Sequence, residues 1–151
     1  MDSFDHQILQ IMQRNARLTT EKIGQEIGLS ATAVQRRLKA LRQSGVIEKE
    51  VAVLNTANLR GHILVIAEVT LKQCGTAIMN NFKTKTANYP EVQQCYYVAG
   101  ENDFILVIAA ISMKRYDVIT QELFLDDDSI LKFHSNVVMG NVKVGLDIPF
   151  F

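Results

Sequence analysis

A stretch of two short helical patterns joined by a glycine constrains this chain more than any other part of the sequence. It runs from Thr19 to Ser44 and reads TTEKIGQEIGLSATAVQRRLKALRQS. Thr19 is predicted to cap the first helix, and Gly28 to end it by adopting the left-handed conformation that other residues resist. Ser30 is then predicted to cap the second helix. Two capped helices separated by such a turn form the helix-turn-helix pattern.

The second of these helices has two different faces. At about 100° per residue, Val34, Leu38 and Leu41 lie within a narrow arc that must pack on the preceding helices. The opposite face carries basic and polar side chains, and residues 31–43 include no acid. A face under selection for solubility alone would mix charges of both signs. We therefore predict that this face binds DNA through Ser30, Thr32, Ala33, Gln35, Arg36, Lys39 and Arg42.

Different members of this set suit different parts of DNA. Thr32, Gln35 and Arg36 can reach hydrogen-bonding groups on base edges in the major groove. Lys39 and Arg42 lie further along the helix and suit phosphate contacts. The competing interpretation is that these side chains are simply solvated, as charges on the outer face of an amphipathic helix often are.

The sequence around this stretch predicts further elements of the same domain. An N-terminal helix is expected to start at Ser3, with Phe4, Ile8, Ile11 and Met12 as its apolar positions. Arg37 lies near the apolar side of its helix, where a pair with a carboxylate such as Glu26 is favoured over DNA. Alternation from Val46 to Leu54 predicts a half-buried strand, and residues 55–60 a linker. Residues 1–60 are thus the predicted DNA-binding domain.

Composition and charge indicate a soluble cytoplasmic protein that contacts no membrane. The 151 residues are 48% hydrophobic, yet no apolar run approaches the ~20 residues that span a bilayer. Residues 1–60 carry nine Lys or Arg and six Asp or Glu, whereas the remainder carries seven and ten. This asymmetry suggests that only the front half meets a polyanion. Cys74 and Cys95 match no metal-binding spacing and are interpreted as small buried thiols.

The back half, residues 61–151, predicts a different architecture. Strands are expected over residues 62–71, 92–99, 104–111 and 130–144, and helices over 75–87 and 113–124. The order β-α-β-β-α-β is that of the ferredoxin-like arrangement, so the chain is assigned to the α+β class. An antiparallel sheet with both helices on one face leaves the other uncovered. Because these strands are apolar on both sides, a second subunit is expected to cover that face.

The sequence offers no convincing catalytic or metal site. Its three histidines fall on separate elements, and the acidic run 126–128 is interpreted as a solvated helix stop. A small-molecule site at residues 100–103 is more plausible. Gly100 would let backbone amides approach a carboxylate, and Asp103 could accept hydrogen bonds from an ammonium group, as an α-amino acid requires. The same four residues also make a good hairpin turn, and that interpretation is favoured on residues alone.

The whole chain resembles the Lrp/AsnC family of feast/famine transcriptional regulators. The front motifs that carry the resemblance are Asp5, Ile8-Leu9, Arg17, Gly28-Leu29-Ser30, Val34, Arg37-Leu38, Leu41 and Gly45-Val46-Ile47. The back motifs are residues 98–104, 135–139 and 142–143. The resemblance implies a winged-helix-like helix-turn-helix domain joined by a strand to a ferredoxin-like effector domain. It also implies homodimers that assemble into tetramers or octamers.

The resemblance further implies an amino acid effector, with no cofactor and no metal. Carried over to this chain, the effector-binding residues are Val98, Ala99, Gly100, Glu101, Asn102, Asp103, His134, Ser135 and Asn136. The sequence departs from the family pattern at Asn102, Phe133 and Ser135, so the identity of the effector is open.

These observations lead to one main hypothesis and two alternatives. The main hypothesis is a sequence-specific regulator that binds double-stranded DNA, is modulated by a small amino acid, and is not an enzyme. One alternative is an enzyme similar to the sirohaem decarboxylases, which look like this family in fold and would make His62 or His134 catalytic. The other is an amino-acid-binding assembly protein without DNA contact. The acid-free face of residues 31–43 argues against the enzyme, whereas the assembly protein would be recognised by its failure to retard its own promoter region.

Overall fold

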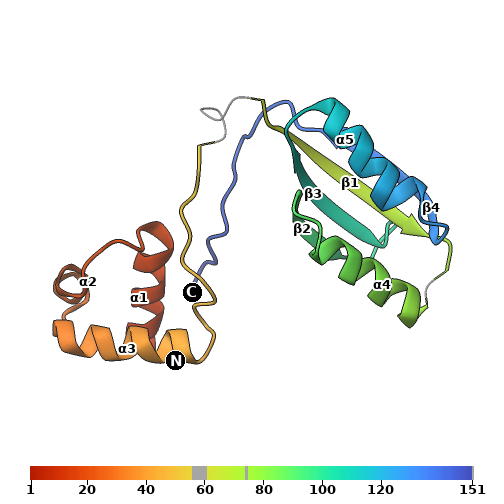
Figure 1. Ribbon diagram of the computed structural model, residues 1–151. Coiled ribbons are helices and arrows are strands. Elements are labelled where there is room, and N and C mark those ends of the chain that lie inside the picture. The colour runs from red at the N-terminus through yellow and green to blue at the C-terminus, as the bar shows by residue number, and fades with distance from the viewer. Residues whose placement is uncertain (56–60, 74, 151) are drawn as a thin grey trace. The chain divides into compact units, whose positions relative to one another are not determined.

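A computed structural model describes residues 1–55, 61–73 and 75–150 of the chain. The chain forms two compact units (Figure 1), one made of Met1–Leu54 with Lys143–Phe151 and the other of Asn55–Val142. The α+β class is confirmed. Residues 56–60 of the predicted linker 55–60, and the predicted buried thiol of Cys74, lie outside the described residues.

The first unit is built on three helices around one small core. These are α1 (Ser3–Arg14), α2 (Thr20–Ile27) and α3 (Ala31–Gln43). Their apolar faces meet in a cluster of Ile8, Leu9, Ile11, Met12, Ile23, Val34, Leu38 and Leu41. The Thr19 and Ser30 hydroxyls accept hydrogen bonds from the amides of Lys22 and Ala33, which confirms both predicted caps.

The start of α1 differs from the prediction. Asp2, not Ser3, is the N-cap, and its carboxylate accepts a hydrogen bond from the amide of Asp5. Asp5 in turn accepts one from the amide of Asp2, which completes a capping box. The carboxylates of Asp2 and Asp5 also interact more favourably with the positive end of the helix dipole than the hydroxyl of Ser3 would.

The predicted strand from Val46 to Leu54 is not formed within the described part of the chain. Val46, Val51, Val53 and Leu54 are all exposed, and Val53 retains 94% of its accessible surface. Alternating apolar residues indicate burial on one side, but a strand also needs a hydrogen-bonded neighbour. No described segment of the chain pairs with these residues.

The C-terminal residues also differ from the prediction, which placed all of 61–151 in the second domain. Residues 143–150 instead belong to the first compact unit. The Gln13 side chain donates to the carbonyl of Ile148 and accepts from its amide, while the His6 ring stacks on Phe150. The final strand ends at Val137, well before the predicted end at residue 144.

The second unit is a four-stranded antiparallel sheet with two helices. The strands are β1 (Ile63–Leu71), β2 (Val92–Tyr97), β3 (Phe104–Ala110) and β4 (Ile130–Val137). The helices are α4 (Thr76–Ala87) and α5 (Met113–Thr120), and α5 continues into a π-helical turn, Gln121–Leu125. The sheet order β2-β3-β1-β4 confirms the predicted ferredoxin-like arrangement.

Both helices cover the same face of this sheet (Figure 1). Alternate residues of β1 and β3, from Val65 to Leu71 and from Phe104 to Ala110, are buried beneath Phe82, Ile119 and Leu123 of the helical layer. The intervening residues of the same strands form the opposite face and are only partly buried. Among the described helices, none is long and apolar enough to cross a membrane.

Candidate DNA interface and effector site

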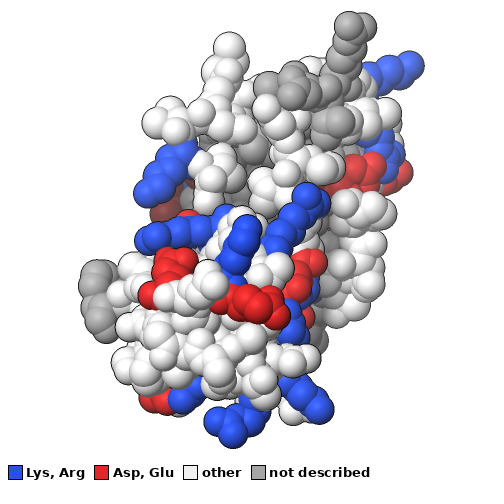
Figure 2. All heavy atoms as spheres, turned by 90° about the vertical axis from the view of Figure 1, so that its left-hand side faces the viewer, with Lys and Arg blue, Asp and Glu red and all other residues white. Residues whose placement is uncertain are grey.

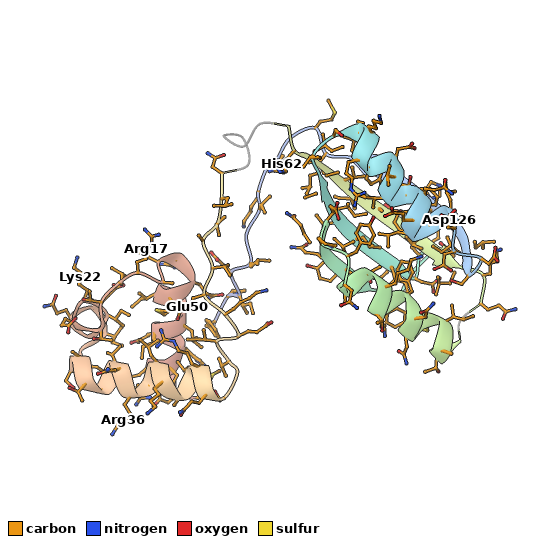
Figure 3. All side chains as sticks on the ribbon, in the orientation of Figure 1. Arg17, Lys22, Arg36, Glu50, His62 and Asp126 are labelled. Carbon is orange, nitrogen blue, oxygen red and sulfur yellow. The ribbon has the colours of Figure 1, made fainter. Side chains whose placement is uncertain are left out.

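The outer face of α3 presents the predicted DNA-binding side chains to solvent. Thr32, Gln35, Arg36 and Lys39 are all exposed, whereas Val34, Leu38 and Leu41 are buried. Figure 3 shows Arg36 pointing away from α1 and α2. In Figure 2, basic side chains project from the lower edge of the first unit, at the level of α3 in Figure 1. The structure therefore leaves this face open to a ligand.

The turn before α3 depends on a second glycine, which sequence reasoning missed. The amide of Leu29 donates to the carbonyl of Gly24 at 2.9 Å, so the turn folds tightly back on α2. A Cβ atom added to Gly24 would lie 2.3 Å from the carbonyl oxygen of Leu29. Gly28 has the predicted left-handed backbone, with φ of +74°. A glycine in a helix interior, which costs stability, was the available signal for Gly24.

Arg37 forms intradomain ion pairs, as predicted, but with different partners. Its guanidinium lies 2.9 Å from Asp2 and 2.8 Å from Asp5, not beside Glu26. Hydrogen bonds to these carboxylates raise the pKa of Arg37 above its ordinary value. The guanidinium also lies 5.5 Å from the centre of the Phe4 ring. Arg37 thus ties α3 to the first turn of α1.

Arg42, a predicted phosphate contact, also has an acidic partner. Its Nε and Nη2 atoms donate to Oε1 of Glu50 at 3.1 and 2.7 Å. Glu50 belongs to the segment that leaves α3, and both side chains are substantially exposed. Any phosphate that binds Arg42 must therefore compete with a carboxylate.

The loop between β2 and β3 holds most of the predicted effector residues. Within it, Asp103 is tied to the end of β1, because its carboxylate accepts from the amide of Leu71 at 2.7 Å. The backbone of Asp103 also bonds Val69 and Val98. Ala99 and Gly100 are exposed, and Glu101 lies 3.5 Å from Lys132. The loop is thus a hairpin turn whose tip, Ala99 and Gly100, is exposed.

Three other predicted residues meet on the helix-free face of the sheet, around a residue that sequence reasoning missed. The Glu68 carboxylate accepts from the amide groups of Asn102 and Asn136, at 3.0 and 3.3 Å. His134 lies directly opposite Glu68 in the pairing of β1 with β4. A single charged residue in an otherwise apolar strand was the available signal.

Ser135 is separated from this group. It lies on the helix-covered face, where its hydroxyl shares a 2.6 Å hydrogen bond with the hydroxyl of Tyr116. Burial raises the pKa of Tyr116 more than this hydrogen bond lowers it. Because successive residues of a strand point to opposite faces, Ser135 cannot join the same site as His134 and Asn136 on one subunit.

Metal-ligating side chains do not gather anywhere in the described residues. No group of three or more His, Cys, Asp or Glu there could hold a metal ion. Cys95 is a free thiol, half-buried beside Thr86, and burial raises its pKa. A thiol with a raised pKa is a poor nucleophile at neutral pH.

Family models match both parts of the chain. A model of the AsnC-type helix-turn-helix domain matches residues 1–42. A model of the Lrp/AsnC ligand binding domain matches residues 64–147. Together they include α1, α2, all of α3 except Gln43, and all of the four-stranded sheet except Ile63.

Individual relatives agree with these models. The chain is 38% identical to HTH-type transcriptional regulator y4tD of Sinorhizobium fredii, over 99% of this chain and 88% of that protein. It is 29% identical to the leucine-responsive regulatory protein of Escherichia coli, over 95% and 87%. Its fold matches the crystal structure of regulator NMB0573 of Neisseria meningitidis in complex with L-Met, with a TM-score of 0.89 and 24% identity over 99% and 96% of the chains.

Proposed function

The chain belongs to the Lrp/AsnC family, and we propose that it is a cytoplasmic, sequence-specific DNA-binding regulator whose affinity for DNA is set by a small amino acid. The names of its relatives are those of transcriptional regulators, which favours this function over a decarboxylase or a DNA-independent assembly protein. The observation that carries the proposal is the exposed, acid-free outer face of α3.

In this proposal α3 enters the major groove. Arg36 would donate two hydrogen bonds to a guanine edge, and Thr32 and Gln35 would read neighbouring bases. Lys39 and the backbone around Ser30 would contact phosphates and fix the register of the helix. Arg37 takes no part, because Asp2 and Asp5 already hold its guanidinium.

Exchange of Arg36 for alanine tests this arrangement. We expect Arg36→Ala to weaken binding to the specific operator by about 5- to 150-fold, since a bidentate base contact contributes about 1–3 kcal/mol. Binding to unrelated DNA should weaken much less. Lys114→Ala is the matched control, because it removes one exposed positive charge from the second unit. Equal losses for both variants, or an unchanged footprint for Arg36→Ala, would contradict the role of Arg36.

An amino acid effector is supported by the ligand binding domain model and by the L-Met complex of the Neisseria protein. The candidate contacts are the exposed backbone at Ala99 and Gly100 for the carboxylate, and the Glu68 group for a polar end of the ligand. Glu101, Asn102 and His134 lie beside these groups on the same end and face of the sheet.

Assembly of at least a dimer is supported by the helix-free face of the sheet. Leu64, Ile66, Ile105 and Val107 lie side by side there and are only partly buried in one chain. A second copy that covers this face would bury them and present two copies of α3 to successive major grooves. Val107→Glu should reduce the mass measured by light scattering, whereas Val118→Glu on the exposed face of α5 should not. An unchanged mass for Val107→Glu would rule out this interface.

A further inference from the structure

The C-terminal segment of the chain returns to the first compact unit and binds α1 (Figure 1). The Gln13 side chain binds the backbone of Ile148 at two points, donating to its carbonyl at 3.0 Å and accepting from its amide at 2.6 Å. Gln10 donates to the carbonyl of Phe150 at 3.3 Å. The Phe150 ring stacks on His6, with ring centres 5.2 Å apart and planes inclined by 16°. Two side-chain amides and one ring of α1 thus hold this segment.

The α1 side chains that make these contacts form one stripe along the helix. His6, Gln10 and Gln13 are spaced so that they lie on the same side of α1, and all three are partly buried. Gln7 and Arg14, elsewhere on the helix, are exposed. A stripe that hydrogen-bonds backbone groups and ends in an aromatic ring fits a peptide segment with an aromatic residue near its end.

Two features of the segment favour its docking on α1. Pro149 restricts the residue before it, Ile148, to extended backbone, so less conformational entropy is lost when Gln13 binds that backbone. Phe150 also packs against the core cluster of the first unit. By contrast, Leu146 retains 77% of its accessible surface. The contact with α1 is therefore concentrated in the residues around Pro149.

α1 is in turn fixed to α3. Ile8 of α1 and Leu38 of α3 belong to the same buried cluster. Arg37 of α3 is paired with Asp2 and Asp5 at the start of α1. The docked segment is therefore anchored to the unit that carries the proposed recognition helix.

The chain passes between its two compact units twice, after Leu54 and after Val142. A single covalent connection lets two units rotate about it. A second connection that is anchored on both units restricts that rotation, and such restriction lowers the entropy lost on binding. Without docking of the C-terminal segment, only the connection after Leu54 would restrain the first unit.

We propose that residues 143–150, docked on His6, Gln10 and Gln13, form a strap that determines which spacing of DNA half-sites the protein accepts. The inference rests on the proposed function, in which two copies present their α3 helices to successive major grooves. A restrained first unit limits how far each α3 can reach, so an operator of different spacing engages only one of the two. The strap therefore adds specificity for DNA geometry without itself touching DNA.

Operators of altered spacing test the proposal on the full chain by fluorescence anisotropy. The probes are the specific operator, the same operator with half a helical turn (about five base pairs) inserted between its half-sites, and a single half-site. Wild type should bind the original spacing at least about a hundredfold more tightly than the altered one, because the second α3 then loses its site. In the Gln13→Ala, Phe150→Ala double variant this ratio should fall by about tenfold.

The matched control is the Gln7→Ala, Leu146→Ala double variant, which changes exposed residues of the same two segments and should keep the wild-type ratio. All three proteins should bind the single half-site equally, because α3 is unaltered. Gln13→Glu places a carboxylate against the carbonyl of Ile148 and leaves the core intact, so it should lower the ratio in the same direction. Hydrogen exchange in residues 143–150, measured by mass spectrometry, should be faster in the strap variants than in the control.

Strap variants that keep the wild-type spacing ratio would overturn the proposal, and so would exchange in residues 143–150 that the substitutions leave unchanged. Failure of the proposed function has a different signature. Wild type would then bind the operator no better than unrelated DNA, and the role of the strap would be refuted with it.

Discussion

Exchange of Glu50 for glutamine tests how far the chain restrains its own contact with DNA. Arg42 lies in the last turn of α3, where the sequence predicts a phosphate contact, yet its guanidinium is held by Glu50. Glu50→Gln keeps the size of the side chain and removes its charge. Arg42 should then be free to bind a DNA phosphate without first losing a carboxylate.

The structure limits the size of this effect. The two hydrogen bonds of 3.1 and 2.7 Å go to the same carboxylate oxygen, and the side chains of Arg42 and Glu50 are 48% and 38% exposed. An ion pair this exposed contributes about 0.2–1 kcal/mol. Its removal should therefore strengthen DNA binding by at most about fivefold. One more phosphate contact should steepen the dependence of log affinity on log salt by about 0.9.

Fluorescence anisotropy with a labelled operator, at four or five salt concentrations, measures both quantities. Glu48→Gln is the matched control, because it removes the same charge two residues earlier from an exposed side chain. Arg42→Ala should weaken binding and reduce the salt dependence. The double variant Arg42→Ala with Glu50→Gln should resemble Arg42→Ala alone, since Glu50 is expected to act through Arg42.

Three results would refute this reasoning. Equal gains in DNA affinity for Glu50→Gln and Glu48→Gln would mean that the loss of one negative charge, and not the release of Arg42, caused the gain. An unchanged affinity for Arg42→Ala would mean that Arg42 meets no phosphate. A gain from Glu50→Gln that persists in the double variant would mean that Glu50 acts on DNA binding without Arg42.

Two further predictions concern the first unit. Arg37→Ala should lower the melting temperature by a few degrees at neutral pH and leave the operator affinity of the folded protein unchanged. Hydrogen bonding from the Asp5 amide and from Arg37 lowers the pKa of Asp2, so its contribution is present above about pH 4 and is lost as the pH falls through the lowered pKa. The stability difference between Arg37→Ala and wild type should therefore shrink in acid. A stability difference that stays the same as the pH falls would contradict a stabilising contact between Arg37 and Asp2. Gly24→Ala should cost about 1–3 kcal/mol of unfolding free energy by urea titration, because its Cβ would meet a backbone oxygen at 2.3 Å. Gln25→Ala, at the exposed neighbouring position, should cost little.

Local patterns predicted the helices because caps and apolar spacing are signals close together in sequence, whereas the sheet order was predicted by matching the order of the elements to the ferredoxin-like arrangement. The caps at Thr19 and Ser30 and the left-handed Gly28 need only their neighbours, and the structure has all three. The expected strand from Val46 to Leu54 needs a partner that sequence reasoning could not name. Val46, Val51, Val53 and Leu54 are exposed and only Ile47 packs on the core of the first unit, so alternation of apolar residues did not by itself predict burial.

In the candidate sites too, contacts between residues distant in sequence could not be predicted. Sequence reasoning placed Arg36 and Arg37 on different sides of α3, which the structure confirms, yet the partners of Arg37 lie 35 and 32 residues away at the N-terminus. The hydrogen-bond partners of Glu68 are two asparagines distant in sequence, Asn102 in the loop between β2 and β3 and Asn136 on β4.

Selective DNA binding is expected to need both units, the first for contact with bases and the second for pairing of two copies. A single α3 offers few base contacts, and each discriminates a wrong base by about 1–3 kcal/mol, so one chain alone is weakly selective. A second copy joined through the helix-free sheet face would double those contacts and raise the effective concentration of the second helix at its half-site. An amino acid can alter DNA binding only if it binds one state of the protein more tightly than another, and such coupling is typically about 1–3 kcal/mol and reciprocal. The operator must then alter the affinity for the amino acid by the same factor.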